Sequence, residues 1–252
     1  GFDVLSAVDD YRVSYSINTG LWDNDAYTLN HRIGLQIPLW STAIGAQISF
    51  TNIFADTSDS TVGNLRLFLQ WFHQFELARR ANLSIGAGFD GYIPTATALD
   101  AQDQRSAFSG FQHPGDSSLN APDLSFAIRP RIHISGQAWV FSAQIVGAAA
   151  IQFVGHEARS VFEWGINFAA QVTEWLALVA EGTGISWIDE PPAWSQRRSV
   201  SLGGGLRFML PGGWIPGIWV RLPATGNRTE HGDGVFIGVE VGWRHDRNWF
   251  LF

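Results

Sequence analysis

The segment Val235-Phe236-Ile237-Gly238-Val239-Glu240-Val241-Gly242-Trp243 carries an apolar residue at every odd position. The segments Ile33-Gly34-Leu35-Gln36-Ile37 and Leu65-Arg66-Leu67-Phe68-Leu69-Gln70-Trp71 also place an aliphatic or aromatic residue at every second position. Successive side chains of a β-strand point to opposite faces, so each segment can form a strand with one apolar and one more polar face. The pattern predicts a sheet whose two faces meet different surroundings.

The same alternation recurs along the chain and predicts an all-β fold of about twelve strands. The expected strands are 11–22, 28–40, 43–52, 63–78, 82–93, 124–135, 138–153, 160–173, 175–186, 198–209, 214–222 and 234–245. Short connections are expected at 41–42, 79–81, 136–137, 174 and 210–213, and longer ones at 23–27, 53–62, 94–123, 154–159, 187–197 and 223–233. Alternating short and long connections are typical of transmembrane barrels with short periplasmic turns and longer external loops.

The apolar parity is predicted to face lipid. We expect it to carry no Asp, Glu or Arg within the strands, and we identify His73 as its one ionisable residue. An arginine on that face would cost about 2–4 kcal/mol at the bilayer midplane, which explains the exclusion. Tryptophans beside the short turns are expected to form a periplasmic girdle. The girdle residues are Trp40, Trp139, Trp175, Trp214 and Trp243, and Phe50, Tyr92, Phe153 and Phe162 are expected near the opposite rim.

Together these features resemble the bacterial outer-membrane β-barrel class, which includes the porins, and the C-terminal Phe252 agrees with it. The resemblance implies a single transmembrane antiparallel up-and-down barrel that spans 1–252 as one domain. It also implies an outer-membrane location, with a signal peptide removed before residue 1. Segment 244–252 departs from the class, because Arg244-His245-Asp246-Arg247-Asn248 interrupts the alternation before the apolar end, which leaves the register of 244–252 open.

The opposite parity carries the charged side chains, which are predicted to line the lumen. These candidates are Arg32, Arg66, Glu76, Asp90, Arg129, Arg131, His133, Glu163, Glu181, Arg207, Arg221, Glu240 and Arg244. Charges inside a narrow barrel must be hydrated or paired. One interpretation is a water-filled path that favours polar or anionic solutes. The other is a lumen plugged by arginine–carboxylate pairs; a barrel of about twelve strands lies between the filled and the open sizes.

The connection 94–123 is the longest. A connection of this length is uncommon unless it is functional or disordered. It either folds into the lumen as a constriction, as the third loop of general porins does, or remains an external surface loop. The sequence leaves both alternatives open.

Other function classes find weaker support. The net charge of −7 argues against a nucleic-acid partner, and the absence of cysteine excludes thiol chemistry. His133 and Ser135 share a strand face, but that face is predicted to point inward, and no nucleophile-elbow motif accompanies them. A lipid-modifying enzyme is therefore the third hypothesis, and no catalytic residue, cofactor or metal ion is assigned.

We therefore expect an outer-membrane channel for passive passage of small polar or anionic solutes. The alternative is a closed barrel that acts as an anchor or as a subunit of a larger envelope complex. The expected partners are outer-membrane lipid and lipopolysaccharide, with a homo-oligomer or an envelope complex as further options.

Overall fold

The chain forms a closed antiparallel barrel in a computed structural model that describes residues 11–21, 27–54, 58–96, 116–119, 121, 123–191, 197–225 and 235–245. The strands pair in chain order, except that β5 pairs with β3 and β4 is added beside β3; β1 pairs with β13, which closes the ring. The strands are β1 (Tyr11–Leu21), β2 (Tyr27–Leu39), β3 (Thr42–Phe54), β4 (Ser58–Val62), β5 (Leu65–Ala78), β6 (Ala81–Ile93), β7 (Phe126–Ala138), β8 (Phe141–Val154), β9 (Glu157–Thr173), β10 (Leu176–Trp187), β11 (Arg198–Phe208), β12 (Trp214–Thr225) and β13 (Val235–His245). Two short helices complete the described elements, α2 (Asp116–Leu119) and η1 (Pro211–Gly213). The predicted all-β barrel is confirmed.

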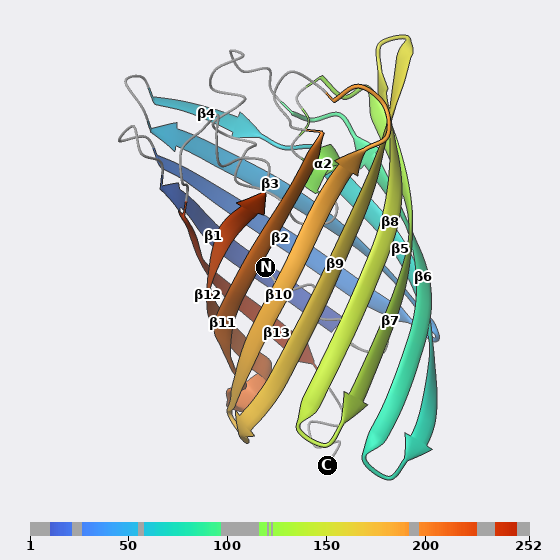
Figure 1. The fold of residues 1–252 in the computed structure, drawn as a ribbon, viewed down its shortest axis with the longest axis vertical. Helices are drawn as coiled ribbons and strands as arrows, with labels where there is room; N and C mark the ends of the chain where they lie inside the picture. The colour runs from blue at the N-terminus through green and yellow to red at the C-terminus, as the bar shows by residue number, and fades with distance from the viewer. Residues whose placement is uncertain are drawn as a thin grey trace.

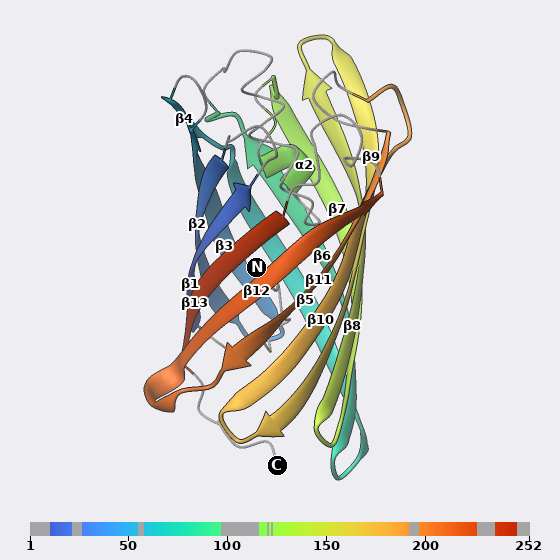
Figure 2. The same ribbon diagram turned by 60° about the vertical axis from the view of Figure 1, so that its left-hand side comes forward.

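Twelve strands make the wall, and β4 is an addition within the expected connection 53–62. The lower part of β3 pairs with β5, from Thr42 to Gln47, and its upper part pairs with β4, from Phe50 to Phe54. The strand β4 therefore takes the place beside β3 that β5 occupies lower down. Figures 1 and 2 show the strands running obliquely around the barrel, with the tight hairpins at one end and α2 inside the ring near the other.

Two connections differ from the prediction. The turn between β7 and β8 lies at Trp139-Val140 and not at 136–137, because Gly136 continues the β7 ladder and Trp139 adopts a φ of 57°. The connection between β8 and β9 was expected to be long, but the two strands pair up to Val154 and Glu157. Gly155, with a φ of 59°, supplies the positive φ that such a tight turn needs, so this external connection is a short hairpin.

Four of the five tryptophans of the predicted girdle are exposed beside the tight turns. Trp40, Trp139, Trp175 and Trp214 are exposed at the ends of hairpins, and Trp40 is 92% exposed. Near the end of β13, the Trp243 indole Nε1–H donates to the Gly212 carbonyl at 3.0 Å. No helix among the described residues is long and apolar enough to cross a membrane.

The outer wall is apolar and the inner wall is polar, so the barrel is inverted relative to a soluble one. Leu67, Ile132, Ile145 and Val239 are among the large apolar side chains exposed on the outside. Phe50, Phe153 and Phe162 are also exposed, as expected for the external rim. Tyr92 lies near the same rim, next to the end of β6, but on the inward parity, where it is fully buried against Leu119 and Ala127.

Candidate functional site

The inner face of the described strands holds most of the charged side chains that the sequence singled out. They lie on the inward parity of their strands, and many of them form ion pairs or hydrogen bonds with side chains of nearby strands. These residues are Arg32, Arg66, Asp90, Arg129, Arg131, His133, Glu163, Glu181, Arg207, Arg221 and Glu240. Glu76 shares the inward parity of β5 but is exposed near the β5–β6 hairpin. The side chain of Arg244 lies outside the described part, although its backbone pairs with Arg12.

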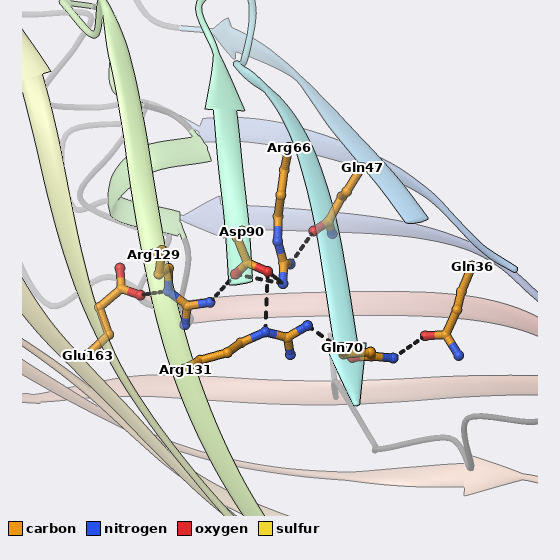
Figure 3. A network of polar contacts seen from close by, with 8 residues as sticks. All are labelled: Gln36, Gln47, Arg66, Gln70, Asp90, Arg129, Arg131 and Glu163. Atoms are coloured by element: carbon orange, nitrogen blue, oxygen red, sulfur yellow. Dashed lines mark hydrogen bonds and ion pairs between the residues drawn. The ribbon is translucent and has the colours of Figure 1, made fainter. Parts of the chain in front are cut away.

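Asp90 is the centre of one charged belt. Its carboxylate oxygens lie 3.1 Å from a guanidinium nitrogen of Arg66, 2.5 Å from one of Arg129 and 3.2 Å from one of Arg131. Arg129 also binds Glu163, with 2.5 Å between Nε and Oε2. Since the four strands β5, β6, β7 and β9 each supply a member, the belt ties together a wide arc of the wall (Figure 3).

Glutamine amides extend this belt toward β2 and β3. Arg66 donates to the Gln47 Oε1 at 2.8 Å. Arg131 donates to the Gln70 Oε1 at 2.9 Å, and Gln70 in turn donates to the Gln36 Oε1 at 2.7 Å. Figure 3 shows the resulting chain of eight side chains. Hydrogen bonds that involve a charged partner are the stronger ones, so the guanidinium groups fix the orientation of the amides.

The opposite wall carries two further ion pairs. Arg207 on β11 binds Glu240 on β13 at 2.8 Å, and Arg221 on β12 binds Glu181 on β10 through its Nε at 2.9 Å. Each pair passes over the strand that separates its members. Gly217 lies between the first pair, in register with both Arg207 and Glu240, and Gly203 holds the same place between the second.

Glycines also accommodate other large inward side chains. A Cβ atom at Gly45 would lie 2.2 Å from the Phe68 ring, and one at Gly238 would lie 2.2 Å from the Trp219 ring. A Cβ at Gly88 would lie 2.7 Å from Arg131. These side chains therefore lie flat along the wall, in space that exists because the neighbouring strand has no side chain there.

The inner face is packed and polar at the same time. Asp90 and Glu163 are 0% exposed, and Arg129 is 1% exposed. Some buried inward atoms have no hydrogen-bond partner within the described part of the chain. These atoms are Asn18 Oδ1, Thr28 Oγ1, Asn30 Oδ1, Tyr92 Oη, Asn167 Oδ1, Glu181 Oε2 and Thr183 Oγ1. Buried polar groups of this kind are normally satisfied by water, so the inner face is built for a hydrated interior.

Part of the long connection 94–123 folds against this inner face. The Asn64 amide donates to the carbonyls of Ser118 at 2.8 Å and Ala121 at 2.7 Å, and its oxygen accepts from the backbone N–H groups of Thr95 and Ala96. Gln152 on β8 donates to the Ser118 hydroxyl at 3.1 Å. Asn64 and Gln152 thus hold α2 from two sides.

A small apolar cluster completes this contact. Leu119 and Ala121 are buried with Leu124, against the inward Tyr92 of β6 and Ala127 of β7. Of the two alternatives left open for the connection, the described residues around α2 follow the lumen-folded one (Figure 2). Residues 97–115, 120 and 122 lie outside the described part. Asn64 was not predicted, because nothing in its local sequence distinguishes it from an ordinary turn residue.

The residues considered for catalysis are not joined as catalysis requires. His133 packs against Phe72, with 4.1 Å between ring centroids, and neither ring nitrogen has a hydrogen-bond partner within the described residues. Ser135 is therefore not activated by it. No group of three or more histidines and carboxylates in the described ranges is arranged to hold a metal ion.

The expectation for the lipid-facing parity was wrong in two respects. Arg198, the first residue of β11, shares the outward parity of Leu202 and Leu206, so that parity does carry an arginine. His73 is not its one ionisable histidine, because His31 shares the outward parity of Leu35 and Ile37 on β2, and His245 shares that of Val239 on β13. The His31 Nδ1 lies 2.8 Å from the Tyr15 hydroxyl, and its Nε2 lies 3.4 Å from the Asn52 amide nitrogen. The parity rule itself identifies His31 when it is applied to the first half of the strand.

The fold is similar to those of several solved outer-membrane barrels. An outer-membrane channel from Pseudomonas putida F1 matches with a TM-score of 0.64 and 11% identity, covering 94% of each chain. The KdgM porin, solved in complex with disordered oligogalacturonate, matches with a TM-score of 0.54 and 8% identity, over 93% of this chain and 99% of the other. Outer membrane phospholipase A from Escherichia coli matches with a TM-score of 0.51 and 11% identity, over 95% and 93%.

No protein-family model and no curated protein matches the sequence. The structural similarities establish the fold class, a porin-like outer-membrane β-barrel, and confirm the resemblance drawn from the sequence. At these identities they establish the fold alone. The same fold occurs in channels and in a phospholipase, so the function must be argued from this chain's own residues.

Proposed function

We propose that the protein is an outer-membrane channel for the passive passage of small polar solutes. The observation that carries the proposal is the hydrogen-bonding inner wall, on which buried polar atoms such as Asn18 Oδ1, Thr183 Oγ1 and Glu181 Oε2 have no protein partner in the described part. A barrel that served only as a rigid anchor would gain stability from an interior in which every polar group is satisfied by protein. An interior with spare acceptors suits water and hydroxylated or charged solutes.

The charge balance favours anions. In the membrane-spanning part of the described strands, seven arginines face four carboxylates on the inward parity. They are Arg12, Arg32, Arg66, Arg129, Arg131, Arg207 and Arg221 against Asp90, Glu163, Glu181 and Glu240. Rings of one charge bias the ions that a pore admits. Because many of these arginines are bound to carboxylates, we expect a modest anion preference.

A closed barrel is the second candidate, and the burial of the charged belt favours it. Asp90, Arg129 and Glu163 are almost inaccessible to solvent, and α2 lies against the same side of the interior. In this alternative the ion pairs brace the wall, and the protein acts as an anchor or as a subunit of an envelope complex. A homo-oligomer and an outer-membrane lipid environment remain predictions under both candidates.

Conductance of the purified full-length chain in planar bilayers separates the two candidates. We expect discrete current steps that scale with salt concentration and a reversal potential that indicates anion preference. Arg131→Gln is expected to keep the steps and to shift the reversal potential toward cations, because it removes one positive charge from the belt. Gln74→Asn, on the inward parity of β5 but exposed near the periplasmic end, is the control. A silent bilayer from folded protein would exclude the channel.

A further inference from the structure

A track of hydrogen-bonded side chains crosses the outer face of the barrel over the four neighbouring strands β1 to β4. It starts at Tyr15 on β1 and continues through His31 on β2 to Asn52 on β3. The hydroxyl of Ser60 on β4 donates to the Asn52 Oδ1 at 3.0 Å. All four residues lie on the outward parity of their strands, so the track faces the surroundings of the barrel and not its lumen.

The register shows that the track rises toward the external end. Tyr15 lies in the outward row of Ile33 and Ile48, which is apolar. His31 lies in the next row, between Ile17 and Phe50. Asn52 and Ser60 face each other one row higher, and the rings of Tyr27 and Phe54 stack above them with 4.5 Å between centroids.

Polar side chains on a lipid-facing surface cost free energy, so their presence there needs a reason. An ionisable residue in a membrane-facing position marks a functional site by default. The outward histidine near the other end, His73, is different, since it is packed between the rings of Trp71 and Phe75. The track on β1 to β4 instead presents hydroxyl, imidazole and amide groups, and the Tyr15 side chain is 39% exposed.

The order of the groups does not suit nucleophilic catalysis. A serine nucleophile needs the histidine as its direct hydrogen-bond partner, with a third group orienting the histidine. Here the Ser60 hydroxyl contacts Asn52, and Asn52 stands between it and His31. The arrangement binds polar groups and does not activate one.

We propose that this track, Tyr15, His31, Asn52 and Ser60, is a binding site for the saccharide headgroup of a membrane-embedded glycolipid. The hydroxyl, imidazole and amide groups of the track supply both donors and acceptors, which matches sugar hydroxyls, since these also donate and accept. The stacked pair of Tyr27 and Phe54 supplies an aromatic surface at the level of the headgroups, where such rings are favoured. No arginine belongs to the track, which argues for a sugar and against a bare phosphate. The proposal rests on the proposed membrane location and not on conduction.

Binding to nanodiscs measures the site directly. The probes are lipid A, a diglucosyl diacylglycerol that carries sugar without phosphate, and phosphatidylglycerol that carries phosphate without sugar. We expect the first two to bind, and His31→Leu and Asn52→Leu each to weaken that binding about tenfold, the size of one or two lost hydrogen bonds. His73→Leu is the matched control and is expected to bind as the unaltered protein does.

Stability and conduction separate this site from a structural role and from the channel. His31→Leu places an apolar side chain on a lipid-facing position, so the barrel is expected to unfold at the same or higher denaturant concentration. The conductance of His31→Leu is expected to equal that of the unaltered protein. If neither protein conducts, the proposed channel function fails, but the glycolipid site does not. Unaltered glycolipid binding in both variants would overturn the proposal. So would equal binding of phosphatidylglycerol, or a large loss of stability in His31→Leu.

Discussion

Arg221 on β12 and Glu181 on β10 bind each other across β11, although neither strand is the other's neighbour. The crossing is possible because Gly203 of β11 lies in register with both residues. A Cβ atom there would lie 3.2 Å from the Glu181 Cγ and 3.0 Å from the Val220 carbonyl oxygen. The ion pair and the glycine are therefore one structural unit, and the same arrangement recurs where Gly217 lies between Arg207 and Glu240.

Gly203→Ala tests this unit. The added methyl group presses on Glu181 and on the β12 backbone, so we expect the free energy of unfolding to fall by about 1–3 kcal/mol. Denaturant titration of the protein in lipid vesicles measures the change. Gly91→Ala is the control, because a Cβ at Gly91 has no atom within 4 Å. Equal effects of the two substitutions would contradict the role given to Gly203.

Removing one member of the pair measures how dry the interior is. Glu181→Leu leaves the Arg221 guanidinium without its carboxylate, and in a dry interior such a change costs about 3–5 kcal/mol. In a hydrated lumen the loss is expected to be about 1 kcal/mol or less, as for exposed pairs. The channel proposal predicts the smaller loss.

A double-mutant cycle with Arg221→Leu gives the interaction energy of the pair itself, by comparing each single variant with the double variant. A loss near the upper value in Glu181→Leu, largely recovered in the double variant, would favour the closed barrel. The measurement is thus independent of conductance.

Asn64→Leu is expected to release α2 from the wall. The amide of Asn64 is bonded at both its nitrogen and its oxygen, and each buried group left without a partner costs about 1–3 kcal/mol. We expect faster proteolysis within 116–121 and a larger or more variable channel conductance. Asn82→Leu, near the periplasmic end of β6, is the control. If α2 stays protected and the current steps keep their size, Asn64 is not its anchor.

The alternation of apolar and polar residues predicted the barrel, because a strand between lipid and lumen needs a different kind of side chain at every second position. It placed Leu67 and Val239 outside and Arg66 and Glu240 inside, and the structure agrees. The same rule places His31 outside, although its polar side chain interrupts the apolar outward row of β2. Strand pairing in a barrel of this kind follows chain order, so the neighbours of each strand were also predictable.

The sequence did not predict which inward side chains bind each other across an intervening strand. Parity says that Arg129 and Glu163 both face inward, but not that Arg129 reaches past β8 to bind Glu163. The turn between β7 and β8 was predicted at 136–137, because glycine is the usual residue at positive φ and Gly136 is the glycine in this stretch. In the structure Trp139 has the positive φ instead. A tryptophan accepts that strain in a position where its indole lies at the membrane interface.

Tryptophan quenching by brominated lipid tests the two faces directly. Trp175 is exposed on the outside near a hairpin, whereas Trp219 is 3% exposed and lies inside over Gly238. We expect Trp175→Phe to reduce the fluorescence that bromine near the headgroups quenches. Trp219→Phe is expected to lower the total emission but to leave the quenched part unchanged, because its ring never meets the acyl chains. A loss of quenched emission in Trp219→Phe would mean that the inner and outer faces have been exchanged, and every residue assignment to the lumen would fail with it.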